Sequence, residues 1–263
     1  MVTLAVFAAA SCSVKEDRWE CPCWLVFEPQ EGARADSDGG FLLSVYHDGS
    51  LQRELTTQVS WESVRSGAYD ISVSKGEKQM SILEGLSGSY ISGTDLLIME
   101  GSQADSIYAH SVFVDCNREE ASVPVESNKQ FATVFLRMED GGAGSYPYSI
   151  CITGDVDGLG LLTLEPHRGP FRYSCGAFSG ENEFRFRLPR QKDGSLRMEL
   201  WEKEGTASSP VDVIPLGEYI LESGFDWGGK SLGDIYIGVD YAQAGIRIRV
   251  NDWETVWTVT EKI

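Results

Sequence analysis

The chain has 263 residues, of which 42% are hydrophobic and 24% charged, so it can bury a core and is neither a disordered nor a collagen-like protein. The 40 Asp and Glu residues outnumber the 22 Lys and Arg residues, which gives a formal charge of −18. This charge repels phosphate backbones and makes nucleic acid a poor partner.

The first twelve residues are apolar and end in a cysteine. Residues 1–11 carry no charge, and a polar stretch follows directly after Cys12. About ten apolar residues are too few for a membrane-spanning helix, which takes about 20, so we interpret residues 1–11 as an export signal. The basic segment that usually opens such a signal is missing, so we expect either that the true start lies upstream or that this sequence begins at an internal Met.

The end of this signal is similar to the lipobox of bacterial lipoproteins. In those proteins the signal is cleaved before a cysteine that is then acylated, and Ala9-Ala10-Ser11-Cys12 fits this pattern except that Ala replaces the usual Leu. The resemblance predicts lipidation of Cys12 and a permanent membrane tether. The alternative is a small-residue cleavage site followed by an incidental cysteine.

Residues 12–23 are expected to form the lipidated linker. Lys15-Glu16-Asp17 resembles the signal that sends lipoproteins of Bacteroidota to the outer face of the outer membrane. A plain solvated linker would have the same composition. The resemblance therefore predicts a surface-exposed protein in the cell outer membrane.

The six cysteines cannot all pair if Cys12 carries lipid, because five then remain. An exported chain permits disulfides, and two pairings are open: Cys21 or Cys23 with Cys116, and Cys151 with Cys175. The spacing of Cys21 and Cys23 does not match a zinc site. No second ligand pair lies near them or near a histidine, so we expect no metal; the histidines are His47, His110 and His167.

Beyond Trp24 the apolar residues alternate with polar ones, which is typical of half-buried β-strands. Two hairpins are predicted, one joining 184–188 to 196–200 through Asp193-Gly194 and one joining 235–241 to 246–250. Segment 94–100 fits a short helix or a strand. Further strands are expected at 41–46, 68–74, 107–114, 130–138, 148–153 and 253–262.

These strands predict an all-β protein made of two antiparallel β-sandwiches. The Gly-rich stretch 139–145 is polar and lies between two strand patterns, so we place the boundary there. The expected domains are an N-terminal sandwich at 24–140 and a C-terminal sandwich at 141–263.

Patterns that would indicate an enzyme are weak. The sequence has no Gly-x-Ser-x-Gly elbow, His-Glu-x-x-His pair or phosphate-binding glycine loop. Asp155-Val-Asp157-Gly158 could begin a calcium loop, but Leu159 and Pro166 stand where an EF-hand needs oxygen ligands, so a turn is preferred. We predict no enzymatic activity, no cofactor and no catalytic residue.

Several segments together resemble the FimB-type anchor lipoproteins of the fimbrillin-related, type V fimbriae of Bacteroidia. The resemblance implies two tandem transthyretin-like β-sandwich domains and an outer-membrane anchor that binds a fimbrial stalk pilin by β-strand addition and limits fimbrial length. In stalk subunits of this family an N-terminal strand is cut away after an arginine; because a cut after Arg18 or Arg34 would release Cys12, an anchor is expected to keep its N-terminus. The final strand, 256–263, either closes the chain's own sheet or is given to a partner. The segments that carry the resemblance are Cys12–Arg18, Cys21–Cys23, Leu25–Phe27, Ser66–Val73, Ile214–Ile220, Trp227, Leu232–Asp240 and Ile248–Glu254.

Two rival functions remain. A surface glycan-binding lipoprotein would expose two or more coplanar aromatic rings, whereas we expect Trp24, Trp201 and Trp253 to be core or rim residues. A stalk or tip pilin of the same system would lack Cys12 and begin after an arginine.

Overall fold

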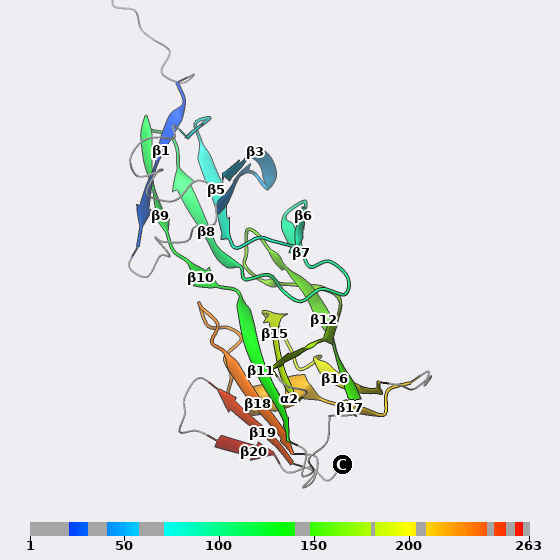
Figure 1. Cartoon of the computed structure of the whole chain (residues 1–263). Helices are drawn as coiled ribbons and strands as arrows, with labels where there is room; N and C mark the ends of the chain where they lie inside the picture. The colour runs from blue at the N-terminus through cyan, green and yellow to red at the C-terminus, as the bar shows by residue number, and fades with distance from the viewer. Residues whose placement is uncertain are drawn as a thin grey trace, which may run out of the picture.

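The computed structural model describes residues 21–30, 41–57, 71–139, 148–179, 182–203, 209–240, 245–250 and 256–259. These residues form strands and one short helix, α2 (Leu216–Glu222), so the all-β prediction is confirmed. Figure 1 shows two β-sandwiches stacked end to end. No helix in the described ranges is long and apolar enough to span a membrane.

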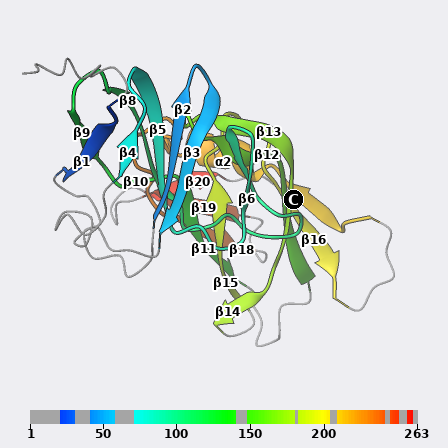
Figure 2. The same cartoon turned by 90° about the horizontal axis from the view of Figure 1, so that it is seen from above.

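The N-terminal sandwich consists of a three-stranded and a five-stranded sheet. In Figure 2 the layer with β1 and β9 lies to one side of β8 and β5. The first sheet has the order β4-β1-β9, with β4 (Ser72–Val73), β1 (Cys23–Pro29) and β9 (Glu120–Val125). The second has the order β10-β8-β5-β2-β3, with β10 (Asn128–Lys129), β8 (Tyr108–Asp115), β5 (Glu77–Glu84), β2 (Phe41–His47) and β3 (Ser50–Thr57).

The C-terminal sandwich consists of two six-stranded sheets. One has the order β14-β15-β11-β18-β19-β20, with β14 (Ala177–Ser179), β15 (Glu183–Pro189), β11 (Phe131–Glu139), β18 (Ile235–Asp240), β19 (Gly245–Val250) and β20 (Val256–Val259). The other has the order β17-β16-β12-β7-β6, with β17 (Asp212–Ile214), β16 (Arg197–Glu202), β12 (Tyr148–Gly160), β7 (Asp95–Leu97) and β6 (Tyr90–Ser92), and β13 (Pro166–Cys175) also pairs with β12.

Most strand pairs are antiparallel, as expected, but two are parallel: β1 with β9, and β11 with β18. The β2–β3 hairpin turns at Asp48 and Gly49, whose φ angles of 50° and 73° are those of the primed turns that match strand twist. The predicted hairpin at 235–250 is confirmed, because β18 and β19 pair along their length.

The other predicted hairpin is wrong. β15 pairs with β11 in one sheet of the C-terminal sandwich, and β16 pairs with β12 in the other. The intervening chain therefore crosses between the sheets. Asp193 and Gly194 do not have the positive φ angles that a primed turn requires, so no such turn forms there. Asp193 instead accepts a hydrogen bond from the backbone N–H of Ser195 at 3.1 Å.

Strand pairing also divides the chain differently from the boundary expected at residue 140. β11 belongs to the C-terminal sandwich, so the change of sandwich falls near Gln130. The segment 94–100, which fitted a helix or a strand, contains the strand β7. β7 pairs with β12, and β6 pairs in turn with β7. At this pairing a Cβ on Gly158 would lie 2.2 Å from the carbonyl oxygen of Leu96, so only glycine lets the strands approach so closely.

The two sandwiches share an apolar cluster. β12 continues beyond the predicted 148–153, and the turn between β12 and β13 packs on the outer face of the five-stranded sheet. The carbonyl oxygen of Leu162, at this turn, accepts hydrogen bonds from Gln79 at 2.8 Å and Ser111 at 2.7 Å. The buried cluster residues are Leu42, Tyr46, Leu83, Leu96, Ile107, Ala109, Leu159 and Leu161.

Candidate functional site

Strand β1 fills the central position of the three-stranded sheet. It pairs with β4 on one side and with β9 on the other. Main-chain bonds fix both sides, with the N–H of Trp24 donating to Glu119 at 2.8 Å and the N–H of Leu25 to Ile71 at 2.9 Å. Without β1, β4 and β9 would have no common partner and two rows of backbone groups would be exposed.

The same strand supplies part of the N-terminal core. Its alternate residues Cys23, Leu25 and Phe27 are buried, while Trp24 and Val26 face outward. The buried side chains pack with apolar residues of β2, β5 and β9. Burial of each such side chain stabilises the fold by about 1.5–3 kcal/mol, so β1 is an integral part of this sandwich.

The predicted lipidation site, Cys12, lies outside the described residues, as do Arg18 and Arg34. β1 begins at Cys23, between these two arginines. A cut after Arg34 would thus separate β1 from the body of the protein, and a cut after Arg18 would separate β1 from Cys12.

The five described cysteines are free thiols in the structure. The pairing of Cys151 with Cys175 is excluded by the sheet register. Ile150 lies opposite Cys175 and Cys151 opposite Ser174, so the two thiols point to opposite faces of the sheet. Cys23 and Cys116, by contrast, are both fully buried in the core of the N-terminal sandwich.

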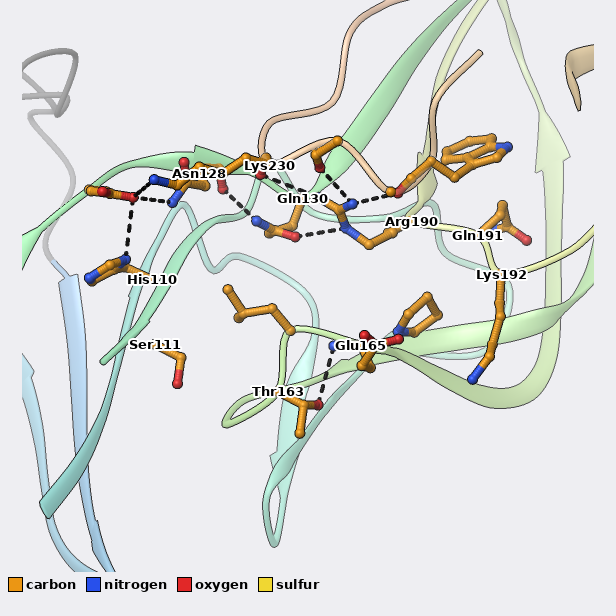
Figure 3. Close-up of a pocket in the computed structure, with 16 residues that line it drawn as sticks. His110, Ser111, Asn128, Gln130, Thr163, Glu165, Arg190, Gln191, Lys192 and Lys230 are labelled. Atoms are coloured by element: carbon orange, nitrogen blue, oxygen red, sulfur yellow. Dashed lines mark hydrogen bonds and ion pairs between the residues drawn. The ribbon is translucent and has the colours of Figure 1, made fainter. Parts of the chain in front are cut away.

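A polar cleft of about 570 Å³ lies between the sandwiches. Figure 3 shows Gln130 and Arg190 on one side of it, facing Thr163 and Glu165. Arg190 is 7% exposed, and its guanidinium donates to Gln130 Oε1 at 2.9 Å and to the carbonyl oxygens of Trp227 and Gly229. Its pKa is lowered by burial, but three carbonyl-type acceptors hold the charge in place.

A second group of charged residues lines the other end of the cleft. Glu126 accepts hydrogen bonds from Lys230 at 2.5 Å and Asn128 at 3.1 Å, and these bonds lower its pKa. His110 Nδ1 lies 3.8 Å from Glu126, but burial lowers the pKa of this histidine. The ion pair and hydrogen bonds among these side chains link β8 and β10 to the loops of the C-terminal sandwich.

The described residues contain no cluster of three or more metal-ligating side chains. Asp155 and Asp157 lie in the strand β12, which is bulged there, so the preference for a turn was wrong. Asp157 Oδ1 lies 2.7 Å from His167 Nδ1 on the neighbouring strand. The pair thus fixes β12 to β13.

Among the described residues, the exposed aromatic side chains lie in four different sheets, so they do not form a shared platform; they are Trp24, Tyr90, Phe113 and Tyr236. Phe135 and Tyr236 stack on each other with centroids 4.9 Å apart and planes at 9°, and the Arg185 guanidinium lies 5.3 Å from the Phe135 centroid. Phe135 is therefore covered on both faces. Trp201 is partly buried, with its Nε1 donating to Glu199 at 3.0 Å, whereas Trp24 is 41% exposed; Trp253 lies outside the described residues.

The last described strand, β20, is the edge strand of the chain's own sheet. It pairs with β19, and no other described strand pairs with its outer edge. Figure 1 places β20 at the bottom of the molecule and the start of β1 at the top. The structure therefore separates an open sheet edge from the strand that leads to Cys12 by the full length of the two sandwiches.

Some residues at the junction were not singled out from sequence. Arg190 and Gln130 read as ordinary polar residues at strand ends, and Asp105 as one of 40 carboxylates. Asp105 is buried and binds the loop at residues 87–89. Only contacts between distant segments distinguish such residues, so no local motif could have identified them.

No protein-family model matches the chain, and no curated protein matches it at a significant level. Solved structures do match. A candidate polysaccharide-binding protein from Bacteroides thetaiotaomicron aligns with a TM-score of 0.63 and 14% identity over 92% of this chain and 99% of that one. A candidate adhesin from Bacteroides ovatus aligns with a TM-score of 0.63 and 14% identity over 91% and 96%.

The fimbrial anchor protein Mfa2 from Porphyromonas gingivalis also aligns, with a TM-score of 0.60 and 10% identity over 89% of this chain and 98% of that one. The chain shares the fold of these proteins. At such identities the likeness is one of fold, and it does not single out the FimB type.

Proposed function

We propose that this chain is a lipid-anchored, non-enzymatic fimbrial subunit that holds a fimbrium to the outer membrane by β-strand addition. Cys12 would carry the lipid, and a neighbouring pilin would join at a sheet edge. Strand addition gives strong attachment without a cofactor, because an exposed ladder edge gains a full set of main-chain hydrogen bonds. A fold shared with a fimbrial anchor protein supports this proposal.

The observation that carries the proposal is the position of β1. The strand completes the three-stranded sheet from within the chain, so this sheet offers no vacant central position for a partner's strand. β1 also connects the sandwich to Cys12, and the edge of β20 lies at the opposite end of the molecule (Figure 1). A subunit at the base of a fimbrium needs this arrangement, with a membrane link at one end and an edge at the other.

The exposed aromatic residues give little support to glycan binding. A glycan site of coplanar rings needs exposed rings side by side, whereas the exposed aromatic side chains of the described residues lie in four different sheets. Several of the groups that line the cleft between the sandwiches already bind each other, although the described residues give no hydrogen-bond partner to His110 Nε2, Gln191 Oε1 and Trp227 Nε1. We therefore retain the anchor as the proposed function.

The tether is tested by mass spectrometry of the protein extracted from membranes of its native host. We expect an N-terminal peptide that begins at acylated Cys12. In the variant Cys12→Ala the protein should leave the membrane fraction and fimbriae should appear in the medium, whereas the matched variant Cys21→Ala should behave like wild type. A mature N-terminus after Arg18 or Arg34 would instead identify a stalk or tip pilin.

The joint at β20 is tested with two proline variants, Trp257→Pro and Thr258→Pro. Successive N–H groups of a strand point to opposite sides, so one variant removes a bond to β19 and the other removes only a donor at the open edge. We expect one variant to unfold at lower temperature. The other should keep the wild-type melting temperature and lose the pilin in pull-down experiments, and retention of the pilin by both variants would exclude this edge.

A further inference from the structure

Two thiols lie against each other where the chain enters the N-terminal sandwich. Cys23 is the first residue of β1, and Cys116 directly follows β8. Both side chains are 0% exposed and belong to the same apolar core. The two side chains are hydrogen-bonded to each other.

The backbone holds both cysteines in place. Cys23 pairs with Val73 of β4, and its neighbour Trp24 is bonded to the β8–β9 connection through Glu119. The N–H of Cys116 donates to the carbonyl oxygen of Gly76 at 3.1 Å. Backbone hydrogen bonds therefore hold both cysteines at the same end of the sandwich, where their side chains share one apolar core.

We propose that Cys23 and Cys116 form a disulfide bond in the exported protein and that this bond ties the start of β1 to the end of β8. The inference rests on the proposed function insofar as it requires export to an oxidising compartment. Cys21, which is partly exposed and precedes the strand, stays a free thiol. Cys151 and Cys175 also stay free because they face opposite sides of their sheet.

The reaction is a thiol–disulfide exchange with a protein or small-molecule disulfide as oxidant. One cysteine thiolate attacks the oxidant's disulfide and releases one thiol, and the second thiolate then displaces the other thiol from the mixed disulfide. Two protein thiols are oxidised, one disulfide is reduced to two thiols, and the two protons pass to the leaving thiolates. Burial and the neighbouring Cys23 raise the pKa of Cys116 to about 12, so this exchange occurs while the chain folds.

Such a disulfide bond would change how β1 transmits mechanical tension between the fimbrium and the membrane. Under the proposed function, tension on the fimbrium reaches the membrane through residues 12–23 and enters the sandwich at Cys23. Without the disulfide, only the hydrogen bonds and side-chain packing of β1 resist its extraction. With the bond closed, the load passes covalently to β8, the strand between β10 and β5 in the five-stranded sheet.

The test uses the full chain with Cys12→Ala, refolded with reduced and oxidised glutathione and digested with trypsin without reduction. Trypsin yields one peptide at 19–34, which contains Cys21 and Cys23, and one at 79–118, which contains Cys116. We expect these two peptides to be linked, and the link to persist in Cys21→Ala and to vanish in Cys23→Ala. We also expect the oxidised protein to unfold about 5 °C or more above the reduced protein, with no such difference in Cys23→Ala.

A link that vanishes in Cys21→Ala, or two free thiols after refolding to the native state, would overturn the proposal. The double variant Cys23→Ala, Cys116→Ala keeps the site apolar but cannot form the link. If it melts at the temperature of the reduced wild-type protein, loss of the link, and not misfolding, accounts for the lower melting temperature. Peptide mapping of the protein from native membranes separates the two proposals. A linked pair without acylation at Cys12 would contradict only the anchor, and acylation at Cys12 with free Cys23 and Cys116 would contradict only the disulfide.

Discussion

Replacing Asp105 by Asn should destabilise the junction between the sandwiches. Asp105 is 6% exposed, and its Oδ2 accepts hydrogen bonds from the N–H groups of Ser87, Gly88 and Ser89 at 3.0, 2.9 and 2.8 Å. Its Oδ1 accepts the Ser87 hydroxyl at 2.7 Å. An asparagine keeps one acceptor for the three N–H groups and places an amide donor opposite that hydroxyl, so the Ser87 hydroxyl must turn to accept and the charge-assisted bonds become weaker neutral ones.

The size of the effect follows from the pKa of Asp105. Burial alone would raise this pKa, but the hydrogen bonds from Ser87, Ser89 and Gly88 outweigh burial and lower it from 3.8 to about 2. At about 1.4 kcal/mol per pKa unit, the charged form contributes about 2 kcal/mol to the free energy of unfolding at pH 7. Because the pKa is lower in the folded state, this contribution is present above about pH 4 and is lost as the pH falls toward 2.

The assay is urea unfolding followed by tryptophan fluorescence at pH 7 and at pH 3. We expect Asp105→Asn to lower the free energy of unfolding by about 2 kcal/mol at pH 7, with about half of the difference remaining at pH 3. Asp48→Asn is the matched control, because the Asp48 side chain is 93% exposed and Asn-Gly suits the same turn. A loss that is equal at both pH values, or below about 0.5 kcal/mol at pH 7, would refute this reasoning.

Three other changes test the junction. Gly158→Ala places a Cβ 2.2 Å from a carbonyl oxygen of β7, so we expect a loss of about 2 kcal/mol or more and faster proteolysis within β6 and β7, whereas Gly176→Ala, with nothing within 4 Å, should be neutral in both assays. Arg190→Lys leaves buried acceptors without donors and should lower the free energy of unfolding by about 2–4 kcal/mol in urea titrations. Burial lowers the pKa of His110 below its usual 6.5, so the folded state favours neutral histidine and its stability should fall as the pH drops below 6.5. In His110→Gln that part of the pH dependence should be absent, and an unchanged slope between pH 6.5 and 5 would contradict the assignment.

Local sequence patterns were sufficient to predict strands that pair with the next strand in the chain. Alternation located about half of the described strands but missed others, among them β3, β5 and β13. The β18–β19 hairpin formed as expected because its strands adjoin in sequence and pair with each other. The same pattern misled at Asp193-Gly194, because alternation shows that a strand has one buried face but not which sheet it joins. The strands on either side of this segment, β15 and β16, cover the same apolar core from opposite sides.

The sequence by itself determined the all-β class and the position of about half of the described strands, and lipidation of Cys12 stays a prediction. Only the tertiary structure decided that β11 and β7 belong to the C-terminal sandwich, and that Cys23 lies against Cys116 while Cys151 and Cys175 face apart. The reason is physical. Burial pattern and turn chemistry act over a few residues, whereas the partner of each strand edge and thiol is set by packing between segments far apart in the chain.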